Sequence, residues 1–61
     1  MKVKVVKSTF CYERYVIFNV FNESGELIDN SFEYLNIYNA NNEFRAFASL
    51  NGWEFDKIEK I

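Results

Sequence analysis

Residues 12–22 place the strongest constraint on the fold, because they form a β-type segment with apolar side chains on both faces. The even positions carry Tyr12, Val16, Phe18 and Val20, and the odd positions carry Tyr15, Ile17 and Phe21. A strand with one solvated face alternates apolar and polar residues. This segment therefore predicts a sheet in which both faces need cover.

The chain is short, and this limits what can supply that cover. It has 61 residues, and a domain of about 60 residues buries only about 60% of the surface that its unfolded chain exposes. Domains of this size usually need a disulfide, a metal or an oligomer interface. Cys11 is the single cysteine and there is no histidine, which excludes an internal disulfide and a tetrahedral zinc site. We expect one domain over residues 1–61, with Cys11 as a buried or half-buried thiol.

The rest of the chain predicts a small sheet and one helix. The alternation over residues 2–10 slips at Val5 and Val6, which predicts either a strand with a bulge or a strand with two solvated and two apolar patches. Gly25 fits the left-handed position of a hairpin turn before a return strand over 26–29. We interpret residues 32–38 as extended, with a short helix as the alternative.

A helix is predicted over residues 42–51. The polar run Asn39–Asn42 resembles a helix start, and Glu43 would place negative charge at the positive end of the helix. Gly52 stands where helices end in a left-handed residue. The inward face carries Phe44, Phe47 and Ala48, with Leu50 beside them.

A closing strand over 53–60 completes the prediction. The fold class is α+β: a small antiparallel sheet of three to four strands with one helix on one face, in the order β-β-β-(β)-α-β. One short helix can cover only one face of the sheet. The other face would be a large apolar patch in a monomer, so we expect a homodimer, the commonest oligomer.

Charge is distributed unevenly along the chain. Residues 1–15 carry four basic groups and one acid, whereas residues 16–61 carry three basic groups and eight acids. A basic edge beside an acidic body could orient two copies against each other. No segment approaches the roughly 20 apolar residues of a membrane span, and the lone cysteine fits a reducing compartment. We expect a cytoplasmic protein without membrane contact.

The sequence argues against an enzyme and predicts no cofactor or metal. General acid–base catalysis most often uses histidine, and the chain has none. Glu54 and Asp56 share a strand face but are expected to be solvated, and no glycine-rich phosphate loop is present. An enzyme with a site assembled across a dimer would need a carboxylate pair at the interface.

A single-stranded nucleic-acid binder is the main alternative function. Lys2, Lys4, Lys7 and Arg14 stand close in sequence to aromatic residues, among them Phe10, and a basic sheet with stacking aromatics can hold single strands. The acidic net charge of −2 and the small number of basic groups make this hypothesis the weaker one.

The segment Leu50-Asn51-Gly52-Trp53-Glu54-Phe55 resembles the helix-Gly-Trp-Glu-apolar ending of small uncharacterised bacterial α/β domains, and this implies no activity. In its small size, excess of aromatic residues and lack of catalytic groups, the chain resembles small phage-encoded inhibitors of bacterial defence systems. That resemblance implies a cytoplasmic, non-enzymatic and often dimeric protein that occupies a surface of a larger host protein. A host regulatory or structural subunit is the rival interpretation.

We therefore expect a protein-binding module, and we expect aromatic and basic side chains to make the contact. Tyrosine and arginine are favoured anchors at protein interfaces. The candidate partner-binding residues are Tyr12, Arg14, Tyr15, Tyr34 and Tyr38.

Overall fold

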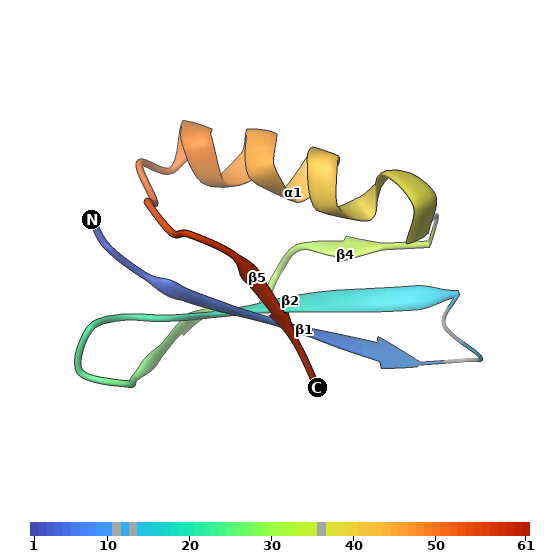
Figure 1. Cartoon of the computed structure of the whole chain (residues 1–61), viewed down its shortest axis with the longest axis horizontal. Coiled ribbons are helices and arrows are strands. Elements are labelled where there is room, and N and C mark those ends of the chain that lie inside the picture. Colours follow the sequence, from blue (N-terminus) through green and yellow to red (C-terminus); the bar gives the residue numbers. More distant parts are fainter. Residues whose placement is uncertain (11, 13, 36) are drawn as a thin grey trace.

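The computed structural model of the chain describes residues 1–10, 12, 14–35 and 37–61, and the side chain of Ile37 is outside this description. The prediction for Cys11 therefore lies outside the described residues. The elements are β1 (Lys4–Phe10), β2 (Tyr15–Phe21), β3 (Leu27–Asp29), β4 (Glu33–Tyr34), α1 (Ile37–Leu50) and β5 (Ile58–Lys60). The strands form one sheet, and α1 lies on one side of it (Figure 1).

The sheet is built around the β1–β2 hairpin. Its strand order is β3-β2-β1-β5, and β4 also pairs with β2. The β1–β2 register runs without interruption from Lys4 opposite Phe21 to Phe10 opposite Tyr15, so the bulge predicted near Val5 is wrong. The slip in alternation arises because Val5 and Val6 belong to opposite faces. The irregularity lies instead in β2 between Val20 and Phe21, where it pairs with β3.

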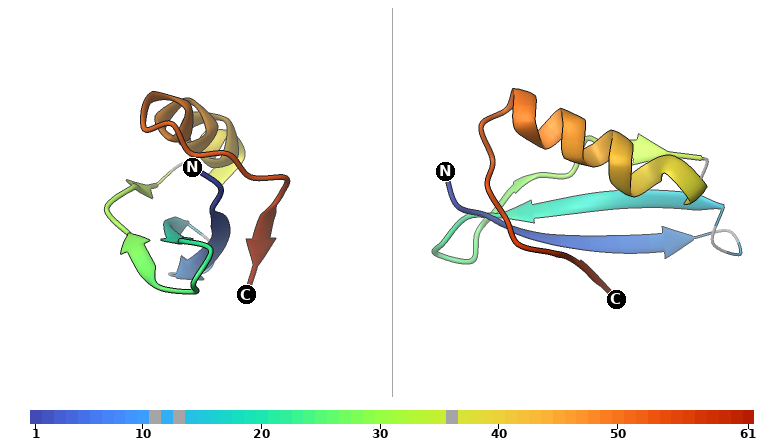
Figure 2. Two further views of the ribbon diagram at one scale, coloured as in Figure 1. Left: turned by 90° about the vertical axis from the view of Figure 1, so that its left-hand side faces the viewer. Right: turned by 45° about the horizontal axis from the view of Figure 1, so that its top comes forward.

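The last strand corrects the prediction of a wholly antiparallel sheet of three to four strands. The sheet has five strands, and β5 pairs with β1 in parallel, from Val5 opposite Ile58 to Lys7 opposite Lys60. The cause is the direction of α1. The helix runs back over the sheet toward the end where β1 begins, so the chain that follows runs in the same direction as β1 (Figure 2). A helical crossover permits such a parallel pair.

The helix begins five residues earlier than predicted. It starts at Ile37, so Asn39–Asn42 lies within it, and Glu43 falls beyond its first turn, which holds no acidic residue. Only Glu33–Tyr34 of the predicted extended segment 32–38 forms a strand. Ala40 explains the difference, because it lies one turn before Phe44 on the same face and is buried.

Both glycine predictions are confirmed. Gly25 and Gly52 have φ values of 86° and 71°. At the end of α1 the amide of Trp53 donates to the carbonyl of Ala48 at 3.0 Å, and that of Gly52 donates to Ser49 at 3.1 Å. These are the two bonds of a Schellman cap. The closing segment is shorter than the predicted 53–60, with an isolated bridge between Lys2 and Glu54 ahead of β5.

The core lies between α1 and the even-numbered face of β2. Phe18 stacks on Phe44 with ring centroids 4.3 Å apart. Leu50, predicted to join the inward face of the helix, is 88% exposed, because it follows Ala48 by two residues and lies about 200° around the helix axis from the buried face. The buried apolar residues are Val5, Val16, Phe18, Val20, Ala40, Phe44 and Ala48.

Candidate functional site

The side of the sheet opposite α1 is the first candidate surface, and we call it the open face. It consists of the β1 and β2 side chains whose phase points away from the helix: Lys4, Val6, Ser8 and Phe10 with Tyr15, Ile17, Asn19 and Phe21. No element among the described residues lies across it (Figures 1 and 2). The prediction that β2 is apolar on both faces, with a helix over only one of them, is therefore confirmed.

Neighbouring side chains shield one another on the open face. Ile17, Phe21 and Val6 are half-buried although no element covers them. Phe10 packs against Tyr15 with ring centroids 6.2 Å apart, and Phe10 is still 48% exposed. The open face thus carries apolar side chains along most of the length of the hairpin.

One polar pair interrupts this apolar surface, and its hydrogen bonds are internal. The Asn19 side-chain amide donates to Ser8 Oγ at 3.0 Å and to the carbonyl of Val6 at 3.3 Å. Both amide hydrogens of Asn19 therefore have acceptors within the face. Burying this pair beneath a partner would leave neither N–H of the Asn19 amide without an acceptor, which avoids part of the penalty for burying an amide.

Charged groups border the open face at opposite corners. Lys4 begins β1, and its Nζ lies 3.9 Å from a carboxylate oxygen of Glu59 on β5. Glu33 lies on β4 across from Ile17, so it shares the phase of the open face and stands at the other edge of the sheet, farther along the hairpin.

A second candidate surface lies at one end of the molecule. The end of β1, the start of β2, the end of β4 and the first turn of α1 lie at this end (Figures 1 and 2). We call this surface the end patch. Its exposed side chains are Phe10, Tyr12, Arg14, Leu35 and Tyr38.

The end patch contains three of the five predicted contact residues. Tyr12 is fully exposed and Tyr38 is 91% exposed, and Arg14, two residues after Tyr12, is exposed as well. Leu35, which is 75% exposed, was missed by sequence reasoning, because a lone leucine between strand and helix gives no signal of its own.

The other two predicted residues lie elsewhere in the fold. Tyr15 is half-buried on the open face against Phe10. Tyr34 is half-buried on the helix side, where its ring stacks on Phe32 at a centroid distance of 6.1 Å. The structure therefore places Tyr34 with the core rather than with the exposed tyrosines.

The backbone of Tyr12 adopts an unusual conformation. Its φ is 58°, in the left-handed region that bulky side chains rarely adopt. Left-handed geometry costs an L-residue roughly 1–2 kcal/mol, and Tyr12 is also fully exposed to solvent. Strained residues concentrate at sites of recognition, and sequence reasoning had no means to detect this one.

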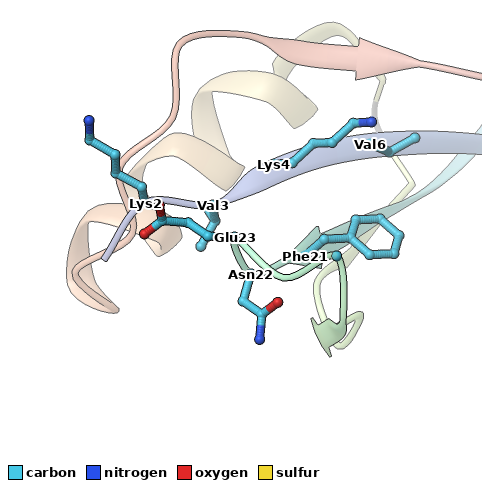
Figure 3. Close-up of a pocket in the computed structure, with 8 residues that line it drawn as sticks. Lys2, Val3, Lys4, Val6, Phe21, Asn22 and Glu23 are labelled. Carbon is cyan, nitrogen blue, oxygen red and sulfur yellow. The ribbon is translucent and has the colours of Figure 1, made fainter.

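The basic residues of the nucleic-acid hypothesis are divided between the two sides of the sheet. Lys7 points to the helix side, where its Nζ donates to Asn41 Oδ1 at 3.1 Å. Lys2 and Lys4 line a surface hollow of about 550 Å³ at the start of β1. Their side chains diverge there, with Glu23 between them and Phe21 below (Figure 3). Phe10 lies at the opposite end of the same strand.

The acidic pair Glu54 and Asp56 lies in the closing segment of the chain. Glu54 is exposed and lies 3.9 Å from the N-terminal amine, and Asp56 is exposed as well. Within ranges 1–10, 12, 14–35 and 37–61, no group of three or more potential ligands among His, Cys, Asp and Glu could hold a metal ion. In the same ranges, no helix has the length and apolar character needed to cross a membrane.

Comparison of the chain with protein-family models, curated proteins and solved structures gave no match. The open face and the end patch are therefore the two candidate contact surfaces, on the basis of their exposure and composition.

Proposed function

We propose that this chain is a non-enzymatic protein-binding module, an inhibitor that acts in the cytoplasm as a homodimer by occupying a surface of a larger bacterial defence protein. The end patch is the contact surface for that protein. The resemblance of the chain in size and composition to small phage-encoded inhibitors supports the class of target.

The observation that carries the proposal is the exposure of large side chains at one end of the fold. Tyr12, Leu35 and Tyr38 are each at least 75% exposed. They come from two separate stretches of the chain that meet at this end of the molecule (Figure 1). Exposed aromatic side chains beside an arginine are the composition of interface anchors.

The strain at Tyr12 adds a second line of support. Asparagine or glycine would adopt its φ of 58° at a lower cost. A tyrosine that touches little of its own protein and still takes this conformation is explained if its ring is presented to a partner.

A quantitative pull-down tests the proposal. The tagged protein is compared with the double variant Tyr12→Ser, Tyr38→Ser in bacterial lysate, with captured proteins measured by mass spectrometry. Anchor residues contribute about 2 kcal/mol each, so the double variant should lose its specific partner by at least about 100-fold in affinity.

The matched control is Leu50→Ser, which removes an equally exposed apolar side chain from the other end of α1. This variant should retain the partner at the level of the wild type. Equal capture by the wild type and the double variant would contradict the proposal, as would the absence of any protein that the wild type enriches.

A further inference from the structure

We infer that the open face is the interface of a two-fold homodimer in which Lys4 of each copy faces Glu33 of the other. This inference deepens the proposed function, since it rests on the homodimer proposed there. It names the surface, the occupant and the charge pair that sets the orientation.

The dimensions of the open face set an upper limit on the area of the dimer interface. The Cα extents of the molecule are 31 × 20 × 18 Å. The strands run along the longest of these and lie side by side along the shortest (Figures 1 and 2). The whole side of the molecule opposite α1 then offers at most roughly 600 Å² per copy, and roughly 1,200 Å² from two copies is the lower limit for specific interfaces.

The chemistry of the open face suits burial against a second sheet. Ile17, Phe21 and Val6 supply an apolar centre, and the polar pair of Asn19 and Ser8 is hydrogen-bonded within the face. Stacked sheets interdigitate such side chains across about 10 Å. Two copies would bury apolar area without leaving the N–H groups of the Asn19 amide unsatisfied.

The border charges are self-complementary. Five charged side chains have the phase of the open face: Lys2, Lys4, Glu33, Glu54 and Glu59, and of these Glu54 and Glu59 lie beside the two lysines. The positive pair lies at the start of β1, whereas Glu33 lies two strands away and four residues farther along the hairpin. Strand spacing and rise place Lys4 and Glu33 roughly 17 Å apart, on a diagonal of the face.

A second copy of this chain can satisfy both ends of that diagonal at once. The midpoint between Lys4 and Glu33 falls near Asn19, at the centre of the open face. Consider a two-fold axis that runs parallel to the sheet, passes over this midpoint and is perpendicular to the diagonal. Rotation about this axis places the Lys4 corner of one copy over the Glu33 corner of the other. Each Lys4 then meets the Glu33 of the other copy, and the contact is made twice, as an isologous interface requires.

Charge reversal tests this orientation. Lys4→Glu creates a chain with two acidic corners, and Glu33→Lys creates a chain with two basic corners. Each variant alone places like charges against each other and should dimerise about tenfold more weakly than the wild type. A 1:1 mixture restores both opposite-charge contacts and should form the heterodimer with the affinity of the wild type.

The measurements are analytical ultracentrifugation from about 1 µM to about 1 mM, the range in which small interfaces dissociate, and native mass spectrometry of the mixture. Circular dichroism confirms that each variant is folded. Ile17→Lys, at the centre of the face, should be monomeric throughout, and Leu50→Lys, on the exposed end of α1, should dimerise normally.

The inference is overturned if the wild type is monomeric over this range, if Ile17→Lys dimerises like the wild type, or if the mixture associates no better than its components. These outcomes are separate from failure of the proposed function. The end-patch double variant keeps the open face, so it should still dimerise, whether or not a partner protein is found.

Discussion

At the scale of a single residue, the backbone conformation of Tyr12 lowers the stability of the fold, whereas its side chain is proposed to contact a partner protein. Its φ is 58° and the side chain is fully exposed. Asparagine adopts this region more readily than tyrosine does. We expect Tyr12→Asn to raise the free energy of unfolding by up to about 1 kcal/mol and to weaken capture of the partner protein.

Urea denaturation followed through Trp53 fluorescence measures this change, since Trp53 packs on Phe44 and Phe47 in the core. Tyr12→Val serves as the control, because a β-branched residue is strained at positive φ and should not stabilise the fold. A clear loss of stability in Tyr12→Asn would show that the tyrosine ring contributes contacts of its own to the fold.

Residues whose role follows from local pattern were predictable from sequence. The common face of Val16, Phe18 and Val20 followed from strand alternation, although alternation did not show which face of β2 the helix covers; the left-handed glycines followed from turn and cap chemistry. The φ of Tyr12 was not predictable, because tyrosine does not favour that conformation and only the tertiary fold imposes it.

At the scale of elements, the start of α1 was predicted too late because a polar run inside the helix was interpreted as its N-terminal cap. Asn39–Asn42 favoured a cap, yet Ala40 repeats the spacing of Phe44 and Ala48 and is buried with them. Burial of that face outweighs the weak helix propensity of asparagine, as tertiary packing commonly does.

The early start of α1 leaves its positive end without a compensating charge, since its first turn holds no acidic residue. We expect Asn39→Asp to raise the free energy of unfolding by about 0.3–1 kcal/mol at low salt. The helix end lowers the pKa of the new carboxyl in the folded state. The gain is therefore present at neutral pH and disappears as the pH falls below about 4, where the carboxyl becomes protonated.

Thermal or urea unfolding at two pH values measures this effect. Ser49→Asp is the matched control, because it puts the same charge on an exposed site in the last turn of α1 and should lower stability by a similar amount. Equal effects of the two substitutions would mean that the helix dipole is not the cause.

The direction of β5 also depends on the path of the chain rather than on its local sequence. Ile58–Lys60 carries the same residue types whether it pairs in parallel or antiparallel. Its direction depends on the end of the sheet at which α1 ends. The periodicity of a strand does not indicate where the preceding helix ends relative to the sheet.

At the scale of the whole molecule, the sequence predicted the open face better than it predicted the end patch. The open face could be predicted because β2 has apolar side chains on both faces and one short helix can cover only one of them. The end patch depends on the end of β1 and the first turn of α1 lying at the same end of the molecule, which is a long-range property of the fold. Tyr34 illustrates the limit, since its composition suits an interface but its strand phase places it toward the core.

Dimerisation through the open face has a thermodynamic consequence for the whole chain. When a folded dimer converts to two unfolded monomers, each tenfold increase in total protein concentration favours the dimer by about 1.4 kcal/mol. The urea midpoint of the wild type should therefore rise with concentration. That of Ile17→Lys should stay constant at a lower value, because a small monomer with one uncovered sheet face buries less apolar surface. A concentration-independent midpoint for the wild type, equal to that of a folded Ile17→Lys, would mean that the open face is stable in contact with water and that 61 residues suffice for this fold without a second copy.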